Sequence, residues 1–285
     1  MKKRGFLEID VFGAAPYRGN PLAVVLDGEG LSTEDMQHFA RWTNFSETTF
    51  LLPPTHPEAD YRVRIFTVAH ELPFAGHPTL GTCHAWLTAL GGKPKTPGRI
   101  VQECGIGTVA IRQQGERLAF AAPPLRRSGP VQEDLLVKLA RVMGIPRGEI
   151  IDSQWVDNGP GWVGVMLRDA DAVLALEPDF SRWESRDHLD LGVIGAYPPG
   201  SECAFEIRAL FSGQGSSMIE DPVTGSLNAS FAQWMLSSGR AKAPYRTSQG
   251  TRLGRKGRPE IDQDAEGTIW VGGTSFTCVR GEVEL

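Results

Sequence analysis

The sequence predicts an α/β (α+β) protein made of two domains of similar design, each a mixed sheet with one long helix packed on it. Three observations support this prediction. The chain has 285 residues, more than one domain usually contains, and it divides into halves of about 140 residues. Segments rich in β-branched and aromatic residues recur between turns rich in glycine and proline. Two junctions, at residues 74–79 and 220–226, open directly into apolar helical runs.

The first domain is predicted to span residues 1–124. Ser32 is expected to be a helix N-cap, with Asp35 three residues later in a weaker form of the capping box. Pro78 suits the first position of a second helix, which Gly91 ends. In chain order, the expected elements are strands at 7–12 and 23–26, a helix from Ser32 to Thr43, strands at 48–52 and 61–66, a helix at 80–90 and a strand meander at 99–124.

The second domain is predicted to span residues 125–285. The strand near 275–285 has an alternative place in the first domain, and the polar segment 179–188 receives no assignment. The expected elements are a helix at 131–143, strands at 150–156, 162–167 and 203–211, a helix at 227–236 and a closing pair of strands within 268–283.

The two helix starts also suggest an internal duplication. Sliding one half over the other by 148 positions gives matched apolar spacing. The positions paired in this way are His77 with Gly225, Trp86 with Trp234, and Gly91 with Gly239. Two helices of equal length could produce the same matches by chance, so that alternative stays open. A true duplication would lead us to expect the two helix starts to face each other across a cleft.

Composition favours small-molecule chemistry in the cytoplasm. The net charge is −5 and the charged residues are interspersed, so no basic face for nucleic acid is expected. The basic start of the chain is followed by Glu8 and Asp10, and no long apolar stretch follows, which argues against a signal peptide or a membrane span. We therefore expect a soluble, cytoplasmic protein with no nucleic-acid or membrane partner.

No metal site or disulfide framework is predicted. Histidines recur every seven residues at His70, His77 and His84, but Pro73 and Pro78 break any single helix that could carry all three. Cys83 follows the first junction at a distance that places it in the helix body, where a reactive thiol is not expected. The four scattered cysteines form no C-x-x-C pair; they are Cys83, Cys104, Cys203 and Cys278.

Glu47, His77 and Asp221 are the candidate catalytic residues. Each also has a purely structural interpretation: Glu47 as a solvated carboxylate at a strand end, His77 as the cap of a turn, and Asp221 as a helix N-cap worth roughly 1 kcal/mol. At the second junction the chain offers a capping side chain, a flexible backbone and free N–H groups that could hold an anion. These features belong to Thr224, Gly225 and Ser226.

Several short motifs then occur in an order and spacing that together are specific. They are Asp10-Val11-Phe12, Gly19-Asn20-Pro21, Asn44-Phe45-Ser46-Glu47-Thr48, Ala75-Gly76-His77-Pro78-Thr79, Glu220-Asp221-Pro222-Val223-Thr224-Gly225-Ser226, and Gln249-Gly250 followed by Gly254-Arg255. Through them the chain resembles the PhzF-like family over nearly its whole length. That family is named for the phenazine-biosynthesis isomerase and shares its fold with diaminopimelate epimerase.

The resemblance implies two pseudo-symmetric domains, each a strongly curved sheet around a central helix, with the active site in the cleft between them. It also implies a homodimer that needs no metal, nucleotide or organic cofactor. In the family, the glutamate that matches Glu47 transfers the proton, and the residues that match His77, Asp221 and Ser226 line the site. The substrate-binding positions are then Ser46, Gly76, Thr224, Gly225 and Ser226.

Moving a proton between carbons of a dihydroaromatic acid needs one group that takes the proton and returns it elsewhere. A carboxylate can do both if its pKa lies nearer neutral than the ~4.3 of free glutamate, as an apolar cleft would ensure. Phe45 and Phe50 are the expected apolar neighbours of Glu47. The positive end of a helix dipole favours a neutral His77, and Asp221 can orient a substrate amine or hydroxyl.

Two departures from related proteins affect this interpretation. Epimerases and racemases of the fold place a cysteine at each helix start, and this chain has Gly76-His77 and Gly225-Ser226 there, so two-thiol chemistry is disfavoured. The glycine-rich run 211–218 is longer than in the family and is expected to border the cleft, so the substrate stays open. We predict a PhzF-like isomerase acting by general acid/base proton transfer on a small carboxylate-bearing metabolite, such as a dihydro-hydroxyanthranilate analogue. The alternative is a non-catalytic ligand-binding protein that keeps Glu47 by descent.

Overall fold

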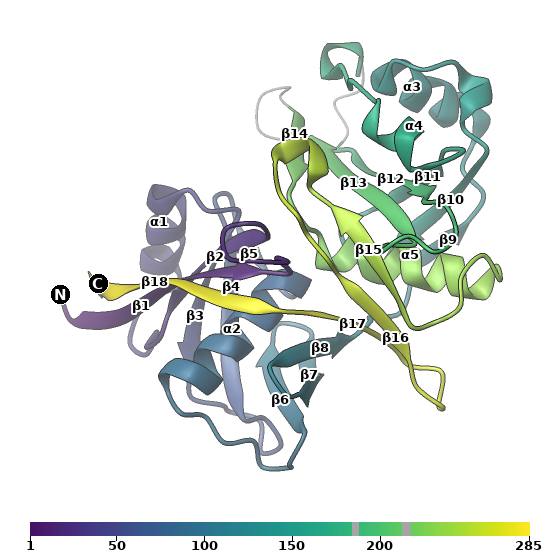
Figure 1. The fold of residues 1–285 in the computed structure, drawn as a ribbon. Coiled ribbons are helices and arrows are strands. Elements are labelled where there is room, and N and C mark those ends of the chain that lie inside the picture. Colours follow the sequence, from purple (N-terminus) through teal and green to yellow (C-terminus); the bar gives the residue numbers. More distant parts are fainter. Residues whose placement is uncertain (184–187, 213–217) are drawn as a thin grey trace. The chain divides into compact units, whose positions relative to one another are not determined.

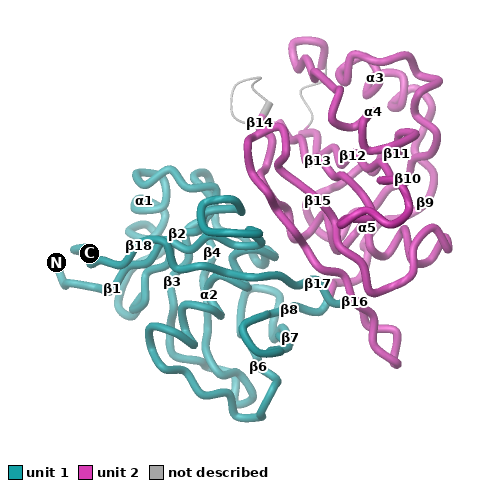
Figure 2. The backbone as a smooth tube through the Cα atoms, viewed as in Figure 1, with its two compact units in different colours: residues 1–121, 270–285 teal, residues 122–269 magenta. Residues whose placement is uncertain are grey.

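The structure, a computed structural model, describes residues 1–183, 188–212 and 218–285. The chain divides into two compact units (Figure 2). Unit 1 comprises Met1–Ala121 and Trp270–Leu285, and unit 2 comprises Ala122–Ile269. The end of the chain returns to its beginning, because β18 (Ser275–Glu284) pairs antiparallel with β1 (Lys3–Val11), as Figure 1 shows.

Unit 1 is a mixed sheet with one helix on each face. Two helices connect parallel strand neighbours: α1 (Thr33–Thr43) links β2 to β3, and α2 (Gly76–Ala89) links β4 to β6. The predicted capping box is confirmed, because the Ser32 hydroxyl accepts the Asp35 N–H and the Asp35 carboxylate accepts the Ser32 N–H. The other strands of the unit are β2 (Asn20–Val25), β3 (Glu47–Leu52), β4 (Tyr61–Thr67), β5 (Glu71–Leu72), β6 (Arg99–Cys104), β7 (Gly107–Gln114), β8 (Arg117–Ala121) and β17 (Ile269–Gly273).

Helix α2 is the central helix of unit 1. It contacts β1, β2, β3 and β8, and its first eight residues are buried, as expected for a helix that is apolar on all sides. It begins at Gly76, two residues earlier than the sequence suggested, so Pro78 is the third residue of the first turn, where its missing N–H costs no helical hydrogen bond. On the other face of the sheet, Phe39 of α1 stacks edge-on with Phe50.

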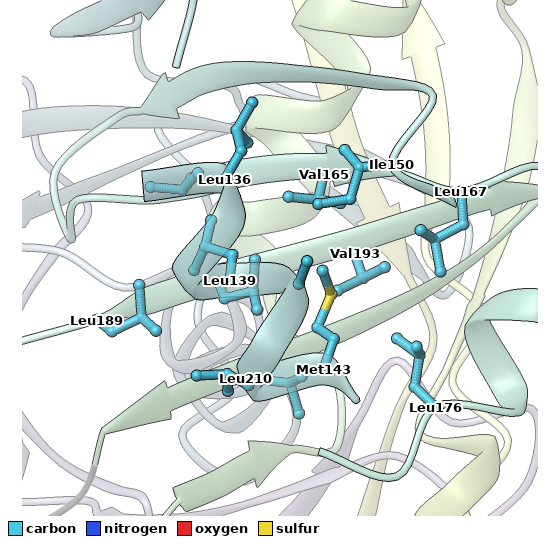
Figure 3. Close-up of a cluster of buried hydrophobic side chains, with 14 of the residues drawn as sticks. Leu136, Leu139, Met143, Ile150, Val165, Leu167, Leu176, Leu189, Val193 and Leu210 are labelled. Atoms are coloured by element: carbon cyan, nitrogen blue, oxygen red, sulfur yellow. The ribbon is translucent and has the colours of Figure 1, made fainter. Parts of the chain in front are cut away.

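Unit 2 also has a sheet covered on both faces. Its central helix, α5 (Gly225–Ser237), packs Leu227, Phe231 and Trp234 against one face, and α3 (Glu133–Met143) and α4 (Ala170–Leu174) cover a second core on the other (Figure 3). The strands are β9 (Arg127–Gly129), β10 (Asp152–Asp157), β11 (Val163–Met166), β12 (Asp190–Ala196), β13 (Phe205–Ser212), β14 (Met218–Asp221), β15 (Tyr245–Gln249) and β16 (Glu260–Gln263), with short 3-10 turns at Arg147–Glu149, Phe180–Arg182 and Thr251–Leu253.

The two units repeat one topology. In unit 1, β1–β2, β3–β4 and β4–β5 are antiparallel, and β2–β3 and β4–β6 are parallel across a helix. In unit 2 the same relations hold for β10–β11, β12–β13 and β13–β14, and for β11–β12 and β13–β15. The predicted fold class, two pseudo-symmetric units with a helix at the centre of each sheet, is confirmed.

The structure corrects the register of the duplication by one residue. Strand pairing makes Glu71 equivalent to Glu220, because they pair with Phe66 and Leu210, which hold the same position in β4 and β13. The offset is therefore 149 rather than 148, and the counterpart of His77 is Ser226 instead of Gly225. The alignment on the tryptophans was one residue off, because Trp86 is the eleventh residue of α2 and Trp234 is the tenth residue of α5.

Candidate active site

Glu47 is placed by the end of helix α1. Asn44 caps that helix in the left-handed conformation, with φ of 60°, and its N–H bonds to the carbonyl of Ala40. Asparagine tolerates this conformation better than most residues, which explains its place in the motif. The chain then turns into β3, whose first residue is Glu47. Glu47 lies on the face that packs against α2, because Thr49, two residues later, accepts a hydrogen bond from Thr82 of that helix.

The expectation that Phe50 is an apolar neighbour of Glu47 is wrong. Side chains alternate along a strand, so Phe50 points to the opposite face from Glu47. There it stacks with Phe39 and Phe66 beneath α1. Glu47 therefore lies on the opposite side of β3 from this aromatic cluster.

His77 is a polar partner that the structure brings to Glu47. The Nε2 atom of His77 lies 3.4 Å from Oε2 of Glu47, and Nδ1 lies 3.4 Å from Nδ2 of Asn20. The side chain of His77 is 5% exposed and that of Glu47 is 18% exposed. Burial lowers the pKa of His77 to about 3, and a hydrogen bond to the backbone of Pro21 acts in the opposite direction. The ring is therefore neutral near pH 7, as expected, although burial is the cause rather than the helix dipole.

The first motif of the chain, Asp10-Val11-Phe12, holds the loop that carries Asn20. The buried carboxylate of Asp10 accepts the N–H of Arg18 at 3.0 Å and the N–H of Gly19 at 2.9 Å. A Cβ atom on Gly19 would lie 2.1 Å from the carbonyl oxygen of Val11, so only glycine fits this close approach. Asp10 and Gly19 thus fix the turn that sets Asn20 against His77.

The start of α2 offers backbone N–H groups from Gly76 and His77. Its N-cap residue, Ala75, makes no side-chain cap, and the first turn has no acidic residue. Thr79 is occupied elsewhere, because its hydroxyl accepts Nε2 of the buried Gln102 at 2.9 Å. Such a helix start is suited to hold an anion. Ser46, also expected to bind substrate, is exposed.

In unit 2, Asp221 and Thr224 are joined directly. The Thr224 hydroxyl donates to Oδ2 of Asp221 at 2.6 Å, and the side-chain cap expected from Thr224 is not formed. The hydroxyl of Thr224 is engaged instead by Asp221 and by Nε2 of Gln249, at 2.9 Å. The N–H groups of the first turn of α5 therefore receive no cap from the side chain of the N-cap residue, Thr224.

Gln249 is the residue that organises this junction, a role that was not predicted from the sequence. Its Oε1 accepts the N–H of Thr224 at 3.0 Å and Nδ2 of Asn228 at 2.8 Å, and its Nε2 donates to the carbonyl of Asp221 at 3.1 Å. Gln249 is fully buried. The only available signal was its position in the Gln249-Gly250 motif, which carries no chemical information by itself.

Gly225 and Ser226 begin α5 as predicted. Gly225 is buried and Ser226 is half-buried. The Ser226 hydroxyl accepts the indole N–H of Trp162 at 3.1 Å, and its carbonyl accepts Nδ2 of Asn158 at 2.9 Å. The loop at 157–162 therefore supports the start of α5 in unit 2, as the Asp10 loop supports the start of α2 in unit 1.

The remaining predictions concern segments and classes of site. The glycine-rich run 211–218 begins in β13 and ends in β14, and residues 213–217 lie outside the described residues. Across the described ranges, no three His, Cys, Asp or Glu side chains are grouped to hold a metal ion. No helix in the described part of the chain is long and apolar enough to cross a membrane.

Comparison with known proteins shows relatives over the whole length. The family model described as phenazine biosynthesis-like protein (PhzC-PhzF) matches residues 9–281. Antisense-enhancing sequence 1 of Schizosaccharomyces pombe is 34% identical over 303 residues, which cover 99% of each protein. Trans-2,3-dihydro-3-hydroxyanthranilate isomerase of Pseudomonas chlororaphis is 31% identical over 288 residues, which cover 98% of this chain and 99% of that protein.

Solved structures of similar fold come from the same family. A phenazine biosynthesis protein of the PhzF family from Enterococcus faecalis has a TM-score of 0.78 at 22% identity, and the match covers 100% of both chains. At this identity the likeness shows the fold alone, whereas the relatives that are named isomerases support isomerase activity. The resemblance drawn from the motifs is confirmed, and the chain belongs to the phenazine biosynthesis-like family.

Proposed function

We propose that this protein is a cofactor-independent isomerase that moves a proton between two carbons of a small carboxylate-bearing metabolite. A dihydro-hydroxyanthranilate or a close analogue is the proposed substrate, because a relative with 31% identity is named for that isomerisation. The observation that carries the proposal is the contact of the Glu47 carboxylate with the buried, neutral ring of His77 at 3.4 Å.

Glu47 is the proposed acid/base group. Its carboxylate takes a proton from one carbon of the substrate and, as a carboxylic acid, returns that proton to another carbon. A protonated histidine at 3.4 Å would stabilise the ionised carboxylate and weaken it as a base. A neutral His77 exerts no such attraction, and it can still accept a hydrogen bond from the protonated form of Glu47 or donate one to the substrate.

The other site residues are proposed to bind and orient the substrate. The N–H groups at Gly76 and Gly225 open two uncapped first turns, so they suit a substrate carboxylate. Asp221 is proposed to orient an amine or hydroxyl of the substrate through its carboxylate. Contacts to the substrate are also proposed for Ser46, Thr224 and Ser226.

The alternative, a non-catalytic binding protein of the same fold, is not favoured, because full-length relatives are named isomerases. A homodimer and a cytoplasmic location are proposed on the family resemblance and on the composition of the chain. Neither bears on the chemistry of Glu47.

The test is proton NMR in deuterated water with trans-2,3-dihydro-3-hydroxyanthranilate. The wild type should rearrange the compound, and Glu47→Gln should bind it without rearranging it, because the amide cannot take a proton from carbon. Glu34→Gln, which changes an exposed carboxylate in the first turn of α1, is the matched control and should act like the wild type. Turnover by Glu47→Gln would refute the role of Glu47, and an inert wild type would refute the proposed substrate.

A further inference from the structure

Asp190 occupies in unit 2 the place that Glu47 occupies in unit 1. Each is the first residue of the strand that follows a parallel crossover, β3 in unit 1 and β12 in unit 2. Thr48, next to Glu47, pairs with Phe66, and Phe66 pairs with Glu71. The matching series in unit 2 pairs Leu191, next to Asp190, with Leu210, and Leu210 with Glu220.

One ion pair in each unit supports this equivalence of positions independently of the strand pairing. Arg64 and Glu71 form a two-pronged ion pair at 2.7 and 2.6 Å, and Arg208 and Glu220 form the same pair at 3.0 and 2.7 Å. Strand pairing also makes Asp157 the counterpart of Asp10. Its Oδ1 accepts the N–H groups of Gly159 and Gly161, at 2.7 and 2.8 Å, as Asp10 accepts those of its own loop.

Asp190 lies on the side of the sheet that packs against α5. Two residues further on the same face is Gly192, where an added Cβ would lie 2.5 Å from Cδ1 of Leu227 in that helix. The carboxyl group of Asp190 is 8% exposed, and its Oδ1 lies 3.1 Å from Nε2 of His188. Its Oδ2 lies 3.6 Å from the position of a Cβ on Gly161, beside the loop that supports Ser226.

A second observation at this place points to a ligand that donates hydrogen bonds. Asn158 in the same loop is 8% exposed, and its Nδ2 is used by the carbonyl of Ser226. Its buried Oδ1 has no hydrogen-bond partner among the residues that the structure describes. A buried acceptor without a partner costs stability unless something else supplies the donor.

We propose that Asp190 is a further substrate-contacting residue, the counterpart of Glu47 in unit 2, and that its carboxylate accepts a hydrogen bond from an amino or hydroxyl group of the substrate. This inference rests on the proposed isomerase function. The first turn of α5 supplies N–H donors for the carboxylate of the same molecule, and Asp190 and Asn158 supply acceptors for its donor substituent. In this half the position of His77 is taken by Ser226, so the carboxyl group of Asp190 has no buried histidine from the helix beside it.

The electrostatic surroundings make this contact sensitive to pH. Burial raises the pKa of Asp190 to about 6, the adjacent His188 acts in the opposite direction, and the negative charge of Asp157 raises it further. The first turn of α5 contains no acidic residue. Asp190 is thus mostly ionised above its pKa, where it is a strong acceptor, and protonated at lower pH, where it is a weaker one.

The experiment measures binding of 3-hydroxyanthranilate, a stable aromatic compound with a carboxylate, an amine and a hydroxyl group. The parent protein is Glu47→Gln, so that binding is measured without turnover. The indole N–H signal of Trp162 reports binding locally, because that group contacts Ser226. Asp190→Asn in this parent should weaken binding at least about tenfold at pH 7.5, as expected for the loss of one charged acceptor. The change should leave the circular dichroism spectrum unaltered, and Asp190→Ser serves as a second variant.

Two controls separate the carboxyl group from its surroundings. Asp152→Asn removes a carboxylate of β10 that pairs with Arg240, and it should bind within about twofold of the parent. The difference between the parent and Asp190→Asn should shrink as the pH falls to about 5.5, and this trend should persist in His188→Gln, because it follows protonation of Asp190. Equal affinity of Asp190→Asn and the parent at both pH values would overturn the proposal. Wild-type turnover tests the isomerase function separately, so the two failures are distinguishable.

Discussion

Nε2 of His77 lies 3.4 Å from Oε2 of Glu47, at the point where the first turn of α2 meets the first residue of β3. The two residues are 30 positions apart in the sequence, and each is set by a different local device. Asn44 ends α1 in the left-handed conformation and directs the chain to Glu47, and the Asp10 loop sets Asn20 against His77. Because burial keeps the His77 ring neutral, the carboxyl group of Glu47 contacts an uncharged imidazole.

The first prediction concerns the charge of His77. The pKa of about 3 means that the ring should stay neutral from pH 8 down to about pH 5. Nitrogen-15 NMR of the histidine side chains should show one ring whose two nitrogen shifts do not move over that range, and His77→Gln should remove that signal. A signal that titrates near pH 6.5 and disappears in His77→Gln would show that the ring carries charge.

The second prediction concerns stability as a function of pH. In the unfolded chain a histidine binds a proton below about pH 6.5, whereas the buried ring of His77 does so only below about pH 3. Between these values the unfolded state binds more protons, so the free energy of unfolding falls as the pH is lowered. Lowering the pH from 6.5 to 5 should therefore remove about 2 kcal/mol through this residue.

Urea denaturation of the wild type and of His77→Gln, at several pH values between 5 and 6.5, measures this contribution. As the pH is lowered, the free energy of unfolding of the variant should fall less steeply than that of the wild type. The difference between the two slopes against pH should correspond to about one bound proton. Parallel curves for the two proteins would mean that His77 binds protons equally in the folded and unfolded states.

The third prediction concerns Gln249. It is fully buried and uses both ends of its amide to hold Thr224, Asn228 and the carbonyl of Asp221. Gln249→Ala should lower the free energy of unfolding by about 3 kcal/mol, since it leaves several buried groups without partners. It should also weaken substrate binding, because the junction before α5 loses its support. Gln263→Ala, at an exposed glutamine of β16, is the control and should change stability by less than about 0.5 kcal/mol. Equal stability of the two variants would show that water replaces the amide.

The helix starts that carry proposed site residues were predictable because their signals are local. A helix start needs only a few residues in sequence, so the junctions at Gly76 and Gly225 could be found, although Pro78 suggested a start two residues too late. The capping box at Ser32 is another local signal, and the structure confirms it. The expected contact between Phe50 and Glu47 is wrong because the two are three residues apart in β3, which places their side chains on opposite faces.

Long-range features could not be read in the same way. β12 was missed because both its faces are buried, so the alternation of a half-exposed strand is absent, and because Gly192 and Gly195 interrupt its apolar residues. The role of Gln249 depends on partners up to 28 positions away. The duplication was visible in the sequence, but its register depends on strand pairing. That pairing aligns Glu71 with Glu220, and it does not align Trp86 with Trp234.

The last prediction concerns the close packing of α2 on its sheet. A Cβ atom on Gly81 would lie 2.5 Å from Cδ2 of Leu22 and 2.9 Å from Cγ2 of Val11, and both of those side chains are fully buried. Gly81→Ala should therefore destabilise the protein by about 1–2 kcal/mol, because overpacking outweighs the better helix propensity of alanine. Since α2 carries His77, the variant should also turn over more slowly.

Gly281→Ala is the matched control for Gly81→Ala. In β18 an added Cβ at Gly281 would meet nothing within 4 Å, so the free energy of unfolding should stay within about 0.5 kcal/mol of the wild type. Urea denaturation compares the two variants directly. If Gly81→Ala were as stable as Gly281→Ala, the sheet would have to yield to α2 without cost, and the glycine would not be needed for the helix to approach β1 and β2.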